Sequence, residues 1–218
     1  MKRFLTRVFS GVLAVLIIYG VQAIFDLVVV PRQIEKLTGT YVTNLQYEAE
    51  NVEDLLADYD FYPEEIALAD LDSLTMPKYV QFREDKTYKF SYDAEAFKRN
   101  VEALFRQSFD AMYDGRDQLS DLYGIDLVSM TKAEFQAFYA ELYSQDSFDT
   151  LVRVLTEDAF DYSVFASDTE TGTFTIKEDK IMCTITGHTT AESLGYKLDE
   201  NSLTLTYSND TEIYTRCN

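Results

Sequence analysis

His188 is the only histidine of the 218-residue chain, and it lies in a polar stretch that also contains Glu192 and Ser193. A nucleophile, a histidine and a carboxylate form the triad of many hydrolases, but members of a triad meet in space and not in sequence. The chain has no Gly-x-Ser-x-Gly segment of the kind that presents a catalytic serine on a sharp turn. We therefore interpret His188 as a loop residue.

Acidic pairs such as Glu64 with Glu65 and Asp114 with Asp117 recur throughout the chain, which has 38 acidic residues in all. A glycosidase needs two carboxyl groups facing one cleft about 5 to 9.5 Å apart, which these spacings do not establish. Residues 110–121 lack the alternate-residue Asp pattern and terminal Glu of an EF-hand loop, and one His with two Cys is too few for a zinc site. We expect no catalytic residues, no metal site, no cofactor and no enzymatic activity.

Cys183 is in phase with Ile181 and Ile185, so its side chain is expected in the core, and Cys217 lies next to the C-terminus. In an oxidising exterior, a Cys183–Cys217 disulfide would tie down the last strand and contribute roughly 3 to 4 kcal/mol. The alternative is two independent reduced thiols, one buried and one exposed.

The charge of the chain excludes one class of partner. Acidic residues outnumber basic ones 38 to 19, for a formal net charge of −19. Such a surface repels phosphate backbones, so we expect no nucleic-acid partner. The 46% of hydrophobic residues are sufficient for a sizeable core.

The N-terminal region differs from the rest of the chain. Residues 1–36 carry five basic and two acidic side chains, whereas residues 37–218 carry 14 and 36. Three of the basic residues precede an apolar run over residues 8–30, which as a helix would span roughly 34 Å and cross a bilayer. Positive charge before the run predicts a cytoplasmic N-terminus, an anchor over residues 1–31 and an exported domain over residues 32–218.

A cleaved secretory signal is the alternative to this anchor, because Val21-Gln22-Ala23 offers small residues where a signal peptidase cuts. The protein is then secreted instead of being a single-pass protein of the cell membrane. We favour the anchor because the apolar run continues past Ala23, and we expect residues 31–36 to form a short interfacial linker.

Strand signals occupy both ends of the exported domain. Residues 37–47 are rich in Thr, Tyr and Val, and residues 78–92 repeat apolar even positions on either side of Glu84-Asp85-Lys86, which predicts a β-hairpin. Further strands separated by turn-forming residues are expected at 173–176, 181–186, 196–198, 202–207 and 212–216. Short strands joined by tight turns predict an antiparallel meander.

The middle of the chain has a helical period. An apolar stripe runs from Phe97 to Met112, and Gly115 suits the end of that helix. Thr131 and Glu134 have the spacing of a capping box before a second helix, and a third is expected over residues 148–160. The fold class is therefore α+β, with an insertion of about three helices over about residues 94–162.

Inward-facing residues of these strands would line any pocket that they enclose. We predict eight apolar residues, all in phase with a buried strand face, as ligand-binding: Phe82, Tyr88, Phe90, Phe174, Ile176, Tyr196, Leu203 and Leu205. The alternative is that the helices fill this space.

Two segments resemble lipocalin-like domains. Leu37-Thr38-Gly39-Thr40-Tyr41 resembles their glycine-x-tryptophan entry strand, with Tyr41 in place of the tryptophan, and the closing segment through Tyr214-Thr215-Arg216 is similar to the final meander of small bacterial lipocalin-like proteins. The resemblance covers about residues 37–47, 78–92 and 172–216, and it implies a β-barrel that binds small, often apolar molecules and has no catalytic residues. Residues 93–165 depart from the pattern, so we expect a meander or a partial barrel.

These observations predict a membrane-anchored, extracytoplasmic, non-catalytic binding module. Its partners would be the lipid bilayer, through the N-terminal helix, and a small apolar ligand. The alternative is a structural or protein-docking component of the cell envelope that has no ligand cavity. A cavity among the strands would favour ligand binding, and an exposed apolar patch on the helices would favour docking.

Overall fold

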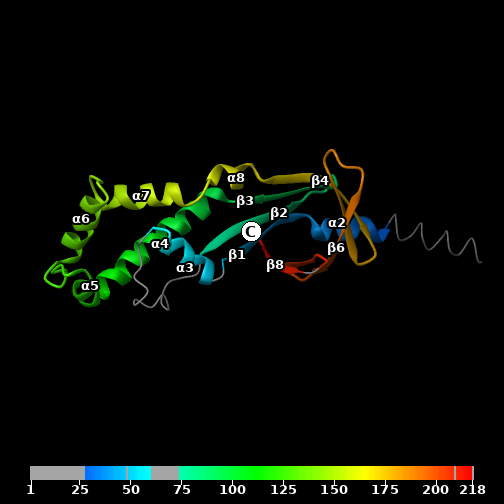
Figure 1. Cartoon of the computed structure of the whole chain (residues 1–218). Coiled ribbons are helices and arrows are strands. Elements are labelled where there is room, and N and C mark those ends of the chain that lie inside the picture. The colour runs from blue at the N-terminus through cyan, green and yellow to red at the C-terminus, as the bar shows by residue number, and fades with distance from the viewer. Residues whose placement is uncertain (1–27, 48, 60–73, 209, 218) are drawn as a thin grey trace, which may run out of the picture. The chain divides into compact units, whose positions relative to one another are not determined.

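The computed structural model of the chain describes residues 28–47, 49–59, 74–208 and 210–217 (Figure 1). The chain divides into two compact units. The barrel unit comprises residues 1–43, 79–90 and 170–218, and the helical unit comprises residues 44–78 and 91–169.

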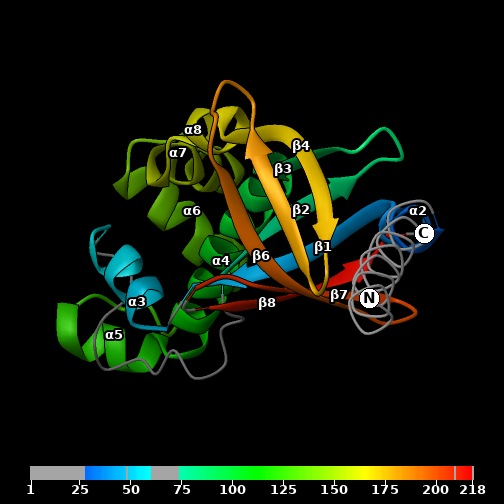
Figure 2. The ribbon, with the colours of Figure 1, turned by 90° about the vertical axis from the view of Figure 1, so that its right-hand side faces the viewer.

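Eight strands form a closed antiparallel barrel in chain order, and the last strand pairs with the first. Figure 2 shows the long strands β4 and β6 with β5 between them. The sequence predicted a meander or a partial barrel, and the structure closes it completely, as in a lipocalin-like fold. The strands are β1 (Gly39–Gln46), β2 (Thr75–Phe82), β3 (Thr87–Tyr92), β4 (Thr169–Lys177), β5 (Lys180–Ile185), β6 (Ala191–Leu198), β7 (Ser202–Thr206) and β8 (Thr211–Arg216).

The interior of the barrel unit is filled by alternate residues of the strands. In β4, Gly172, Phe174 and Ile176 are buried while the residues between them are exposed, as the period of two in a strand requires. Tyr41 and Tyr214 are completely buried in the same core. Burying one large apolar side chain is worth about 1.5 to 3 kcal/mol, so this packed interior stabilises the barrel.

A short helix, α2 (Val30–Leu37), precedes β1 and buries Ile34 and Leu37 in the barrel core. The predicted linker over residues 31–36 was therefore wrong. Pro31 opens the helix, because the N–H that proline lacks has no partner in the first turn of any helix.

The predicted anchor lies, up to residue 27, outside the described residues. Within the described ranges, no helix has the length and apolar character needed to cross a membrane.

The helical unit confirms the three predicted helices as α4, α6 and α7. Gly115 caps the end of α4, and the Thr131–Glu134 capping box opens α6. Among the helices that were not predicted, α5 buries only Leu119, and α8 buries none of its residues, so neither has an apolar stripe in the sequence. The described helices of this unit are α3 (Ala49–Ala57), α4 (Ala94–Asp114), α5 (Arg116–Tyr123), α6 (Lys132–Leu142), α7 (Phe148–Ala159) and α8 (Tyr162–Ser167).

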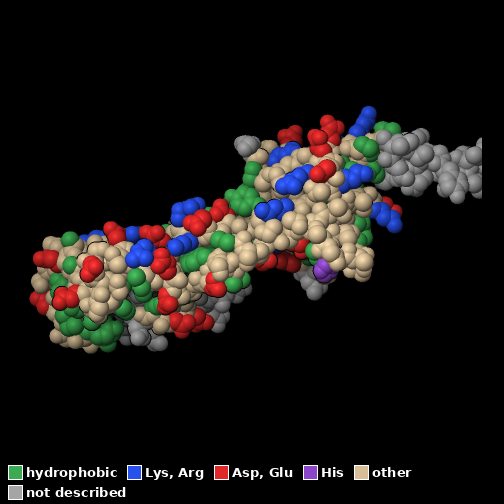
Figure 3. All heavy atoms as spheres, turned by 90° about the horizontal axis from the view of Figure 1, so that it is seen from above, with side chains coloured by type: hydrophobic (Ala, Val, Ile, Leu, Met, Phe, Trp, Pro, Cys, Tyr) green, Lys and Arg blue, Asp and Glu red, His purple; other side chains and the backbone are tan. Residues whose placement is uncertain are grey.

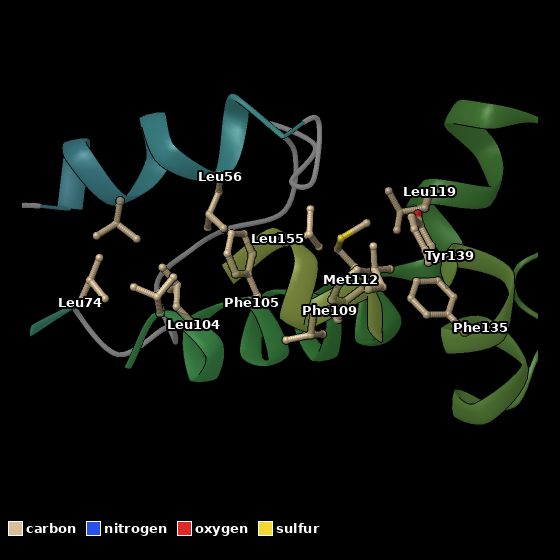
Figure 4. Close-up of a cluster of buried hydrophobic side chains, with 14 of the residues drawn as sticks. Leu56, Leu74, Leu104, Phe105, Phe109, Met112, Leu119, Phe135, Tyr139 and Leu155 are labelled. Atoms are coloured by element: carbon tan, nitrogen blue, oxygen red, sulfur yellow. The ribbon is translucent and has the colours of Figure 1, made fainter. Parts of the chain in front are cut away.

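The helical unit has an apolar core of its own. Figure 4 shows Phe105, Phe109 and Met112 on α4, in one cluster with Leu155 of α7. The ring of Phe109 lies edge-on to that of Phe148, with centroids 4.8 Å apart, an arrangement that aromatic pairs prefer. The predicted apolar stripe of α4 is therefore confirmed as the centre of this core.

Candidate functional site

The structure brings the eight predicted ligand-binding residues together in the barrel core. Six of them are 5% exposed or less: Phe82, Tyr88, Phe174, Ile176, Leu203 and Leu205. Phe90 and Tyr196 are partly buried against this cluster.

These side chains pack against one another. The rings of Phe82 and Phe174 lie 5.0 Å apart, and those of Tyr88 and Phe90 lie 5.5 Å apart. The aromatic groups therefore fill the space in which an apolar ligand would lie, and ligand binding by them stays a prediction.

Cys183 and Cys217, which were predicted to form a disulfide, are free thiols in the structure. The Cys183 side chain is buried inside the barrel on β5, and Cys217 directly follows β8. β6 and β7 lie between these strands, and each step between neighbouring strands is roughly 4.8 Å. Two strands thus lie between the two residues in the barrel wall, and a disulfide between them stays a prediction.

His188 is exposed in the turn between β5 and β6, where its backbone N–H donates to the Ile185 carbonyl oxygen at 2.9 Å. This position agrees with its interpretation as a loop residue.

Three glutamates gather at the end of the barrel where β4, β6 and β8 begin. Glu170, Glu192 and Glu212 each lie two residues before a buried residue of the same strand, so they share the inward-facing side of the wall. We call this group the glutamate end of the barrel.

Tyrosine hydroxyls donate hydrogen bonds to two of these carboxylates. The Tyr88 hydroxyl donates to Glu170 Oε1 at 2.8 Å, and the hydroxyls of Tyr207 and Tyr214 both donate to Glu212 Oε2. Burial, reinforced by the neighbouring carboxylates, raises the pKa of all three tyrosines. The phenols therefore stay protonated and act as hydrogen-bond donors.

Cys183 is close to the same carboxylates. Burial, together with the negative charges of Glu170 and Glu192, raises the pKa of its thiol to about 12. Because the thiolate is the nucleophilic form of cysteine, Cys183 is unreactive at neutral pH.

A groove of about 580 Å³ opens in the barrel wall between β6 and β7. Pairing between β6 and β7 runs only from Leu198–Leu203 to Gly195–Thr206, whereas β6 stays paired with β5 as far as Ala191. The two strands separate beyond Gly195, and the groove fills the gap. Its lining residues are Lys180, Glu192, Ser193, Leu194, Gly195, Thr206, Tyr207 and Ser208.

The backbone of Ser193 faces this groove. Tyr196 donates its N–H toward β5, to the Asp179 carbonyl oxygen at 3.2 Å. Backbone groups of an antiparallel strand point alternately to its two neighbours, so those of Gly195 and Ser193 point toward β7. Gly195 is paired with Thr206 of β7, which is the last pair between these strands. Within the described residues, β7 has no residue opposite Ser193.

Neither the glutamate end nor the groove was predicted from the sequence. One signal was available, because Glu192 and Glu212 are in phase with the buried Leu194 and Tyr214, and a charged residue in phase with a buried strand face is unusual. The groove itself had no sequence signal, since it depends on where pairing between two strands stops.

Comparisons with known proteins assign no family to this arrangement. No family model matches the sequence, and no curated protein or solved structure is significantly similar to the chain. The closed barrel agrees with the lipocalin-like resemblance at the level of fold.

Proposed function

We propose that the protein is a non-catalytic binding module, held on the outer side of a membrane by its N-terminal segment, which binds a short extended peptide in the groove between β6 and β7. The observation that carries this proposal is the interrupted pairing of β6. Within the part of the chain that the structure describes, residues 191–194 pair with β5 on one side and with no strand on the other. An extended peptide can add itself to such an edge through backbone hydrogen bonds.

The side chains of the groove support a ligand with charges of both signs. Lys180 lies opposite Gly195 in the β5–β6 register, and Glu192 lies three residues from Gly195 along β6. At about 3.4 Å per residue, these charges are separated by roughly 10 Å along the strand. A peptide segment with one acidic and one basic side chain is complementary to this pair.

A small apolar ligand has less support from the geometry. Phe82, Phe174 and Leu205 would have to leave the core to make room for it. Such a rearrangement exposes or displaces well-packed side chains, which costs several kcal/mol. The groove needs no such rearrangement.

Native mass spectrometry of the full chain in detergent tests the proposal, with an equimolar pool of acetylated tetrapeptide amides built from Lys, Glu, Thr and Val as the probe. We expect peptide adducts on the folded wild-type chain. Ser193→Pro should abolish them, because proline removes the N–H that faces the groove and leaves pairing with β5 intact.

Ser193→Ala is the matched control, since it keeps the N–H and should bind peptides as the wild type does. An unchanged charge-state distribution will show that the Pro variant is folded. Adducts that persist in Ser193→Pro, or a folded wild type without any adduct, would contradict the proposal.

The anchored, extracytoplasmic placement has its own test. Protease added to intact cells should cleave the chain beyond Pro31, and the N-terminal segment should remain with the membrane fraction. Protection of the chain beyond Pro31 would contradict an outside location.

A further inference from the structure

The corner between α5 and α6 in the helical unit exposes four large apolar side chains. Leu122 is 54% exposed, Tyr123 54%, Ile125 41% and Val128 52%. They lie within seven consecutive residues, and we call them the corner patch. Figure 3 shows hydrophobic side chains at the surface of this unit, interspersed with carboxylates.

The backbone of the corner patch is held in a fixed conformation. Gly124 ends α5 in the left-handed region, with φ of 65°, which glycine adopts without steric cost. Leu127 is buried in the helical core, and its N–H donates to Ser120 Oγ at 2.9 Å. A patch that is already ordered loses little conformational entropy when a partner binds.

Tyr123 extends the patch toward α6. Its phenol is near enough to Tyr139 of α6 to contribute to the raised pKa of that residue, although burial is the larger cause. Buried Tyr139 packs against Phe135 with ring centroids 4.8 Å apart. Tyr123 is therefore the patch residue nearest in charge interaction to the aromatic core of the helical unit, in which Tyr139 and Phe135 lie.

Exposed carboxylates lie close to the corner patch in sequence. Asp117 and Asp121 precede the patch on α5, Asp126 lies between Ile125 and Val128, and all three side chains are exposed. Lys132 and Arg116 are the basic residues closest to the patch in sequence. Lys132 is paired with Asp110 at 2.6 Å, and the Arg116 guanidinium stacks on the Tyr113 ring at 4.1 Å. The patch thus combines an apolar centre with an acidic rim.

We propose that the corner patch docks a cationic amphipathic helix of a partner protein. Apolar side chains of such a helix cover Leu122, Ile125 and Val128, and its Lys or Arg residues meet the acidic rim. An anionic membrane surface is repelled by the same carboxylates, and a second copy of this chain would bring two acidic rims together.

The test uses the full chain in nanodiscs of zwitterionic lipid, with empty nanodiscs subtracted. The probe is a fluorescein-labelled peptide of about 18 residues, composed of Leu and Lys at helical spacing, and binding is followed by fluorescence anisotropy. We expect one saturable site. The double variant Leu122→Ser/Val128→Ser should weaken binding by about tenfold or more.

Two controls separate docking from general charge attraction. Ile213→Ser removes an apolar side chain of similar exposure, 64%, from β8 of the barrel unit, and it should leave binding unchanged. Asp121→Lys should weaken binding, whereas Glu200→Lys, a charge reversal in the exposed turn before β7, should have little effect.

Four results would overturn the proposal. The first is equal binding of a scrambled peptide of the same composition, and the second is unchanged binding by the double variant. The third is binding of the corner patch to anionic vesicles, and the fourth is concentration-dependent pairing of this chain through the patch in analytical ultracentrifugation.

Discussion

The guanidinium of Arg216 lies over the ring of Tyr41, with its central carbon 5.4 Å from the ring centroid. The two residues are opposite each other where β8 closes the barrel against β1. Arg216 Nη2 also donates to the carbonyl oxygens of Lys36 and Thr38. One side chain thus joins the end of α2 to the first and the last strand, and the lipocalin-like resemblance depends on those two strands.

Replacing Arg216 should therefore loosen the closure of the barrel. Arg216→Met removes the cation–π contact and the charged donor, so we expect a loss of about 2 to 3 kcal/mol in the free energy of unfolding. Urea-dependent alkylation of Cys183, which is buried in the barrel core, measures the unfolding of this unit. Arg83→Met is the control, because the exposed Arg83 side chain donates to Gln81, two residues away on the same strand end. An equal loss in both variants would contradict the role of Arg216.

Gly172 should tolerate no side chain. A Cβ at this position would lie 2.1 Å from the Thr184 carbonyl oxygen and 2.7 Å from Tyr88 Cε1. Backbone must move to make room, so Gly172→Ala should destabilise the barrel by about 1 to 3 kcal/mol or more. In Gly195→Ala the atom nearest to the new Cβ would be Thr206 Cβ at 3.4 Å. Urea-dependent alkylation of Cys183 should therefore give this variant a free energy of unfolding close to that of the wild type.

Lys86 marks a place where the protein can be stabilised. It has φ of 65° in the turn between β2 and β3, where the Lys86 N–H donates to the Arg83 carbonyl oxygen at 3.0 Å. This φ lies in the left-handed region, where a residue with a Cβ is strained. Lys86→Gly should therefore raise the free energy of unfolding by about 0.5 to 1 kcal/mol. Glu84→Gly, at a residue of the same turn with negative φ, should instead lower it, and the reverse order would refute this explanation.

The two thiols should differ in reactivity. Cys183 is 3% exposed and its pKa is raised to about 12, whereas Cys217 is only half-buried. Iodoacetamide at pH 8 without reductant should alkylate Cys217 first and Cys183 only after unfolding, as intact-protein mass spectrometry can follow. A chain purified from an oxidising compartment that resists alkylation at both cysteines until it is reduced would instead have the disulfide.

Alkaline pH should destabilise the barrel unit. The pKa values of Cys183, Tyr88 and Tyr214 are raised, chiefly by burial. The unfolded chain loses these protons near pH 8.5 for Cys and about 10 for Tyr, while the folded chain keeps them. Stability is therefore at its full value below about pH 8.5 and falls as the pH rises toward 12, by up to about 1.4 kcal/mol per pH unit for each group.

Urea denaturation at a series of pH values measures this dependence. Tyr88→Phe removes one of the titrating groups, so its stability should fall less steeply with pH than that of the wild type. Equal slopes would show that Tyr88 keeps no raised pKa in the folded state.

The local sequence determined most of the secondary structure. A period of two marked the β2–β3 hairpin, and a period of 3.6 residues marked the apolar face of α4, because burial of one face imposes its period on the residue pattern. Turn-forming residues marked the limits of the later strands. Thr131 and Glu134 likewise fixed the start of α6, since the contacts of a capping box span only three residues. Helices that bury little, such as α8, leave no such pattern.

Tertiary structure alone decided how these elements combine. Barrel closure pairs Tyr41 with Arg216 across 175 positions of the chain, and no local period encodes a contact of that range. The groove exists because β6 loses its pairing with β7 beyond Gly195 while it keeps its pairing with β5. Local sequence fixes which side of a strand each residue faces. The register between strands depends instead on the free energy of the whole packed barrel. That register placed Glu170, Glu192 and Glu212 at one end.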